Sequence, residues 1–233
     1  MNRDYVRADI AKGWTFLKTL ELGQIFSNPM PIVSSEEFRD SALNHDESYE
    51  NLYLTGLRQR DYNILLLDFS FLQIGISEEH HVRYGYYPNP FLGSSERAIA
   101  ELGELHTYVD EGLISIEGYL AKIGELRRSQ HAPLLRYENA PSQYREYIHP
   151  CSHFHMGHHD TNRWPLQRVL TPLAFCMIVA RQFYSGSWFS AGEITLFGKR
   201  QVPDGFLEDV KEDCRILGDD LFSSKEARLF AFT

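Results

Sequence analysis

The chain has 233 residues and a net charge of −9; 43 % of its residues are hydrophobic and 24 % are charged. This composition is that of a globular protein, and the length suits one large domain or two small ones. Three widely spaced cysteines without a Cys-x-x-Cys pair argue against a disulfide framework and a thiolate zinc site. Without a signal-peptide pattern or an apolar run long enough to span a membrane, we expect a cytoplasmic protein.

The first half of the chain predicts helices followed by a hairpin. Apolar residues at helical spacing predict a helix over 4–26, and serines followed by two acids indicate a second helix at 34–44. Residues 62–77 are rich in Ile, Leu and Phe and predict one long strand. Residues 80–91 are its expected hairpin partner, which two prolines end.

The second half alternates helical and extended patterns. Residues 94–128 are strongly helical in content, with Gly112 expected to divide them into two helices. A strand is predicted at 133–140. A Thr-Pro pair opens a helix over 170–184, and a last helix is predicted at 203–217.

Together these elements predict an α+β fold, in which an antiparallel sheet has helices packed on one face and helical segments stand at both ends. We expect a single domain over 1–233. Its parts are a helical N-terminal extension at 1–50, a sheet-containing core at 51–200, and a C-terminal helix and tail at 201–233.

Histidines are concentrated in the stretch HPCSHFHMGHH, which holds five of the ten in the chain: His149, His153, His155, His158 and His159. If residues 151–156 form a strand, alternation places His153 and His155 on one face, toward a cleft or solvent. Phe154 and Met156 then point to the core. His149 joins the histidine face if Pro150 does not break the strand.

The basic residues gather around the same stretch. Between Leu126 and Arg200 there are nine lysines and arginines and four acids, so this part carries +5 and the rest of the chain −14. One interpretation is a positive pocket for an anionic substrate. The alternative is chance together with charges that cap helices.

Three interpretations of the histidine cluster stay open. The first is a polar strand face without a function. The second is a divalent metal site, with His153, His155 and His158 as ligands. In this interpretation HFHMGH resembles the HxHxDH motif of metallo-β-lactamase-like hydrolases, although Gly157 replaces the motif's aspartate.

The third interpretation is an acid–base site without a cofactor, because histidine titrates near neutral pH. Arginines that can hold phosphate would support it, and the candidates are Arg136, Arg163 and Arg181. Cys151 between His149 and His153 suggests a further alternative, a thiolate nucleophile.

Residues 136–184 resemble the second half of an uncharacterised bacterial family, domain of unknown function 2290. The resemblance rests on four motifs: Arg136-Tyr137-Glu138, His149 to Gly157, Asn162-Arg163-Trp164-Pro165, and Leu170 to Tyr184. The chain departs from the pattern at Asn162, Trp164 and His155. Since His155 stands where many members have threonine, the resemblance favours His149 and His153 in a shared role.

The stretch RYEN-x-P followed by His-x-His is also similar to TumE-type toxins of toxin–antitoxin modules. That likeness implies an RNA target and an active site lined by these residues: Arg136, Glu138, Asn139, His153 and His155.

We therefore expect a toxin- or defence-type nuclease that acts without a metal, with RNA as the expected substrate and DNA as the alternative. Its expected catalytic residues are His153, His149, His155, Arg136 and Glu138, and its substrate-binding residues are Arg163, Arg181, Asn139 and His158. The alternatives are a subunit of a larger assembly, with an antitoxin or a defence ATPase as partner, and a metal-dependent hydrolase. An oligomer is compatible with each.

Overall fold

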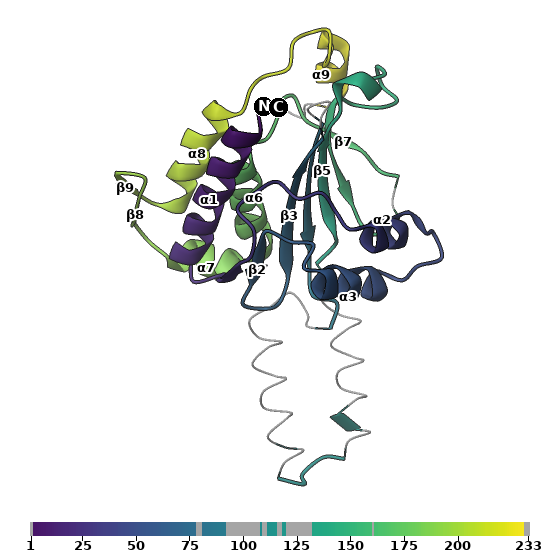
Figure 1. The fold of residues 1–233 in the computed structure, drawn as a ribbon. Helices are drawn as coiled ribbons and strands as arrows, with labels where there is room; N and C mark the ends of the chain where they lie inside the picture. The colour runs from purple at the N-terminus through teal and green to yellow at the C-terminus, as the bar shows by residue number, and fades with distance from the viewer. Residues whose placement is uncertain are drawn as a thin grey trace.

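The computed structural model describes residues 2–77, 81–91, 108, 111–115, 118–119, 132–159 and 161–230. Within them the chain folds as an α+β protein, as predicted, with helices at both ends and an antiparallel sheet between them (Figure 1). The helices expected within 94–128 lie almost wholly outside these residues. Gly112 is described and has a φ of 71°, which suits a break in a helix.

The main sheet has seven antiparallel strands that follow one another in chain order. They are β1 (Gly23–Phe26), β2 (Ile64–Leu66), β3 (Phe71–Ile76), β4 (Val82–Tyr87), β5 (Leu135–Asn139), β6 (Ser152–Met156) and β7 (Trp164–Pro165). A separate two-stranded sheet is formed by β8 (Ile194–Leu196) and β9 (Lys199–Gln201). The strands predicted at 80–91 and 133–140 correspond to β4 and β5.

One face of the main sheet, which we call the core face, packs against α1 (Arg3–Thr19), α6 (Pro172–Phe183), α7 (Ser185–Ser190) and α8 (Pro203–Asp213) (Figure 1). Thr171 caps α6 through its side chain and Pro172 follows at the first position, as the Thr-Pro pair predicts. The Asp9 carboxylate of α1 accepts from the Leu173 N–H at 2.9 Å, so the two helices share a cap. A short helix, α9 (Ser224–Phe230), ends the described chain.

The opposite face, which we call the second face, also carries helices. Phe38 of α2 (Glu36–Leu43) and Tyr53 of α3 (Tyr49–Gln59) pack with Phe71 and Tyr87 of the sheet. The prediction of helices on one face therefore describes α1 and α6 but not α2 and α3. Strands β2, β3 and β4 bear apolar side chains on both faces, which is why a second layer can form there.

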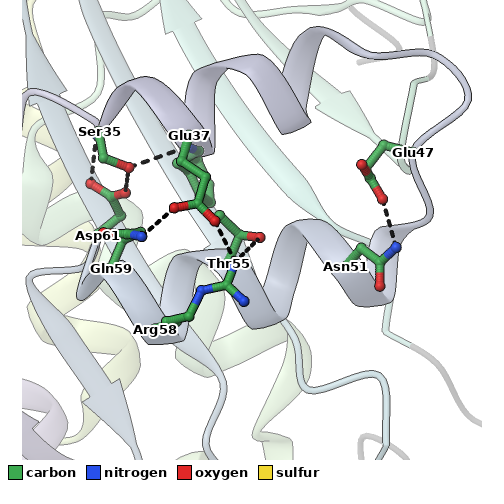
Figure 2. A network of polar contacts seen from close by, with 9 residues as sticks. Ser35, Glu37, Glu47, Asn51, Thr55, Arg58, Gln59 and Asp61 are labelled. Carbon is green, nitrogen blue, oxygen red and sulfur yellow. Dashed lines mark hydrogen bonds and ion pairs between the residues drawn. The ribbon is translucent and has the colours of Figure 1, made fainter.

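A polar network ties α2 to α3 and to the chain beyond (Figure 2). Asp61 accepts hydrogen bonds from the backbone N–H and hydroxyl of Ser35, and Glu37 binds both Arg58 and Gln59. Between the two helices lies a cavity of about 580 Å³, whose lining is mostly polar and holds three acids, Glu37, Asp40 and Glu47, against one cation, Arg58.

Two predicted elements are shorter than expected. The helix predicted over 4–26 ends at Thr19, and the last part of that range forms β1. The long strand predicted over 62–77 is two strands, because Asp68 accepts from the N–H and the hydroxyl of Ser70 and closes a turn between β2 and β3. Phe69 adopts a positive φ of 64° within that turn.

None of the helices in the described part of the chain has the length and apolar character needed to cross a membrane. The three cysteines are all buried and free.

Replacing Tyr137 by Phe tests how β5 and β6 are held against the core. The buried Tyr137 hydroxyl contacts the Ser152 hydroxyl at 2.9 Å and accepts from the Leu170 N–H at 2.9 Å. Tyr137→Phe leaves that N–H without its acceptor, and we expect the free energy of unfolding to fall by about 1–3 kcal/mol. Urea denaturation measures this. An unchanged denaturation midpoint would show that the hydroxyl contributes nothing.

Candidate functional site

The strand pairing of β5 with β6 brings four predicted site residues together. Arg136 stands opposite His155, and Glu138 stands opposite His153. Cross-strand partners point to the same side of a sheet, and residues two apart on one strand share that side. The four side chains therefore form a square on the second face, with the Tyr137 ring packed in the core on the other side.

The two histidines of β6 contact each other inside this square. The Nε2 atoms of His153 and His155 lie 3.0 Å apart, and the His153 Nδ1 lies 2.8 Å from the Pro150 carbonyl oxygen. That carbonyl can only accept, so Nδ1 carries the proton and the unprotonated Nε2 faces the Nε2 of His155. His153 is fully buried and His155 is 7 % exposed.

Burial sets the charge of these rings. Desolvation, followed by the neighbouring His155, lowers the pKa of His153 to about 4. Desolvation and Arg136 lower the pKa of His155 as well, while Glu138 opposes both shifts. Both shifts favour the neutral form of the ring.

Arg136 is part of the square, and two further arginines, Arg83 and Arg163, act on its members. Arg83 on β4 pairs with Glu138, with 3.4 Å between Nε and Oε1. The charge of Arg136 acts on His155 and His158, and that of Arg163 acts on His149 and His155. The Nε of Arg136 is buried without a hydrogen-bond partner in the described part of the chain.

Arg83 was not among the residues predicted from the sequence. The sequence does carry a signal for it: if 80–91 pairs with 133–140, every second residue of the two strands lies on one face, so a basic residue of 80–91 can neighbour Glu138. The register that selects Arg83 as the neighbour of Glu138 is set by the folded sheet, in which Arg83 stands opposite Glu138.

His149 joins the group from the connection before β6. Its ring lies edge-on to that of His153, with centroids 5.1 Å apart. His149 is not part of strand β6; its backbone forms an isolated antiparallel β-bridge with Arg145. Desolvation lowers its pKa, and Arg163 adds to that shift.

His158 belongs to a neighbouring group outside the square. After the turn at Gly157, the Nε2 atoms of His158 and His159 lie 2.9 Å and 3.3 Å from the Glu47 carbonyl oxygen. The His158 ring also packs near Tyr49 of α3. These contacts link the end of β6 to the α2–α3 connection.

Two other predicted residues lie elsewhere. Asn139 is buried on the core face, where its amide is 3.8 Å from the Cys151 sulfur. Arg181 on α6 forms an ion pair with Asp204 at 3.0 Å. Neither is placed to hold a substrate at the histidine pair.

Strand β6 and the residue before it, Cys151, bear on two further expectations. Phe154 packs against the core as predicted, whereas Met156 is 39 % exposed at the strand end. Burial raises the pKa of the Cys151 thiol to about 11, so it stays protonated at neutral pH and a thiolate nucleophile is disfavoured.

Among the described residues, one group of ligand atoms could hold a metal ion: Glu138, His153 and His155, whose ligand atoms lie within 4.8 Å of one another. Glu138 thus takes the third position that the sequence-based metal interpretation gave to His158.

The fold and this face define an α+β protein with a seven-stranded antiparallel meander and a histidine–glutamate–arginine cluster on two neighbouring strands. The chain belongs to the family described as "Uncharacterized conserved protein (DUF2290)", whose family model matches residues 24–232. This agrees with the family resemblance of residues 136–184. Neither a curated protein nor a solved structure matches the chain.

Proposed function

We propose that the chain is a nuclease that cleaves phosphodiester bonds in single-stranded RNA on its second face. The observation that carries the proposal is Arg136. Its Nε has no hydrogen-bond partner among the described residues, and it stands opposite the histidine pair. Among the described residues no ion pair joins this guanidinium to a carboxylate, so it is suited to an anion, and its planar fork matches phosphate oxygens.

The surroundings of Arg136 support an anionic substrate. The charge of Arg163 acts on His155 and His149, and Glu138, the acid within the square, is paired with Arg83. Positive charge therefore prevails locally although the whole chain carries −9. Such a local field attracts phosphate in a protein that is acidic elsewhere.

RNA is favoured over DNA because its 2′-hydroxyl provides a nucleophile next to the phosphorus. The histidine pair offers unprotonated nitrogen to accept the 2′-hydroxyl proton. The 2′-oxygen attacks phosphorus, the bond to the 5′-oxygen breaks, and that oxygen takes up a proton. The products are a 2′,3′-cyclic phosphate and a 5′-hydroxyl. The arginines stabilise the charge that develops on the phosphoryl oxygens.

The test uses the purified wild-type chain with a labelled single-stranded RNA and a DNA of the same sequence, each with and without added divalent ions. We expect the RNA to be shortened to fragments that end in 2′,3′-cyclic phosphate, while the DNA stays intact. RNA that remains intact under every condition would contradict the proposal. Cleavage of both strands alike would contradict the role given to the 2′-hydroxyl.

A toxin or defence role rests on the likeness to TumE-type toxins and is part of the same proposal. Its partner would be an antitoxin or a defence ATPase, and the acidic cavity between α2 and α3 is compatible with a basic partner surface. Expression of wild-type and His153→Ala chains in bacteria tests this role. Equal growth with intact cellular RNA in both cultures would contradict it.

A further inference from the structure

We propose that Glu138, His153 and His155 form a binding site for a divalent transition-metal ion, with zinc as the best chemical match. This inference deepens the proposed function. Only the catalytic use of the ion rests on that function. Binding itself is argued from the geometry of three side chains.

The distances are near those of a shared ion, which requires the three ligand atoms to draw closer together or adjust slightly. Each residue offers one ligand atom, and the three atoms lie within 4.8 Å of one another. Two imidazole nitrogens bound to zinc at about 2.0–2.1 Å with a tetrahedral angle are about 3.3 Å apart. The observed 3.0 Å between the two Nε2 atoms requires an adjustment of only a few tenths of an ångström.

The ligands are also oriented from behind. The His153 Nδ1 donates to the Pro150 carbonyl, and a backbone carbonyl in this position is a common outer partner of a metal-bound histidine. Arg83 holds the Glu138 carboxylate from the neighbouring strand. All three ligands stand on paired strands of one sheet, so their separation is fixed by the register of β5 with β6.

The donor set selects the kind of ion. Two imidazoles and one carboxylate suit zinc and its neighbours, whereas calcium and magnesium prefer oxygen ligands alone. Three protein ligands leave a coordination position for water or substrate, as in catalytic zinc sites. A metal-bound hydroxide would then take over the role of proton acceptor from the imidazoles, and the ion would bind a phosphoryl oxygen beside Arg136.

The competing explanation of the same contact is a direct hydrogen bond, in which the His155 Nε2–H donates to the His153 Nε2. That bond closes the pair and leaves no lone pair directed at an ion. The two explanations differ in one measurable property, which is saturable metal binding that depends on Glu138.

The experiment uses the full chain, purified without a histidine tag and stripped with a chelator. Zn²⁺ and Co²⁺ are titrated by calorimetry, and bound metal is counted by elemental analysis after dialysis. The ligand variants are Glu138→Gln and His155→Gln, and the matched control is His158→Gln, which removes a neighbouring histidine outside the ligand set. Circular dichroism verifies that each variant is folded.

We expect about one equivalent of metal on the wild-type chain and on His158→Gln, and an affinity at least about tenfold lower for both ligand variants. The inference is overturned if the wild-type chain binds less than about a tenth of an equivalent. It is also overturned if the folded ligand variants bind as tightly as the wild type, or if His158→Gln alone loses the ion.

The two proposals fail separately. Metal bound by the three ligands while RNA stays intact would overturn the nuclease and leave the metal site standing. RNA cleavage by a chain that binds no metal and ignores the chelator would overturn the metal site and leave the nuclease.

Discussion

An Arg136→Gln chain is expected to cleave single-stranded RNA about 100- to 1000-fold more slowly than the wild type, because a preorganised donor to the developing phosphoryl charge is lost. The same change is expected to leave thermal stability unchanged or slightly raised. The Arg136 Nε is buried without a partner in the described part of the chain, so losing this donor breaks no hydrogen bond among those residues.

Arg200→Gln is the matched control for this prediction, since it removes the same charge from the β8–β9 hairpin. Arg200 is exposed and pairs with Glu193 at 3.1 Å. Cleavage rates under single-turnover conditions and melting temperatures are compared for the three chains. Equal rates for Arg136→Gln and Arg200→Gln would remove Arg136 from the site and reduce its effect to overall charge.

Phe175→Ala is expected to lower the free energy of unfolding by about 3–5 kcal/mol, the range for a large aromatic side chain in a rigid core. Phe175 is fully buried on α6, and its ring centroid lies 5.6 Å from that of Tyr84 on β4. Removing the ring opens a cavity between the helix and the sheet, which close packing prevents from collapsing fully.

Phe189→Ala provides the comparison, because Phe189 on α7 is 65 % exposed and its loss is expected to cost less than about 0.5 kcal/mol. Chemical denaturation of both variants gives the difference. If Phe175→Ala and Phe189→Ala cost the same, α6 does not pack on the sheet as described.

Much of the fold could be predicted from local patterns. The Thr171-Pro172 pair predicts where α6 begins, and the hairpin partner expected at 80–91 and the strand expected at 133–140 are β4 and β5. Two failures have one cause. Residues 62–77 are rich in apolar residues on both sides of Asp68, so periodicity alone does not reveal the turn that Asp68 closes between β2 and β3. Likewise, the amphipathic pattern of 4–26 continues past Thr19 into an edge strand.

The site could be predicted as far as it depends on the alternation of side chains along a single strand. This alternation puts His153 and His155 on one face of their strand, and it puts Arg136 and Glu138 on one face of theirs. The same alternation excludes Asn139, because it directly follows Glu138 and therefore points to the opposite, core face. Which strands pair, and in which register, is decided by the whole sheet. For this reason Arg83 was missed, and His158 was assigned to a group from which the turn at Gly157 removes it.

The connections between neighbouring strands of the meander differ greatly in length. Strands β5 and β6 are joined by a short connection, so Glu138, His153 and His155 meet when a single hairpin closes. Arg83 reaches Glu138 only across the segment 88–134. Because loop-closure entropy grows with the logarithm of length, doubling that segment costs only about 0.6 kcal/mol. Insertions or deletions there would leave the three donor atoms in place, so the length of this segment is free to vary among proteins that keep the same cluster.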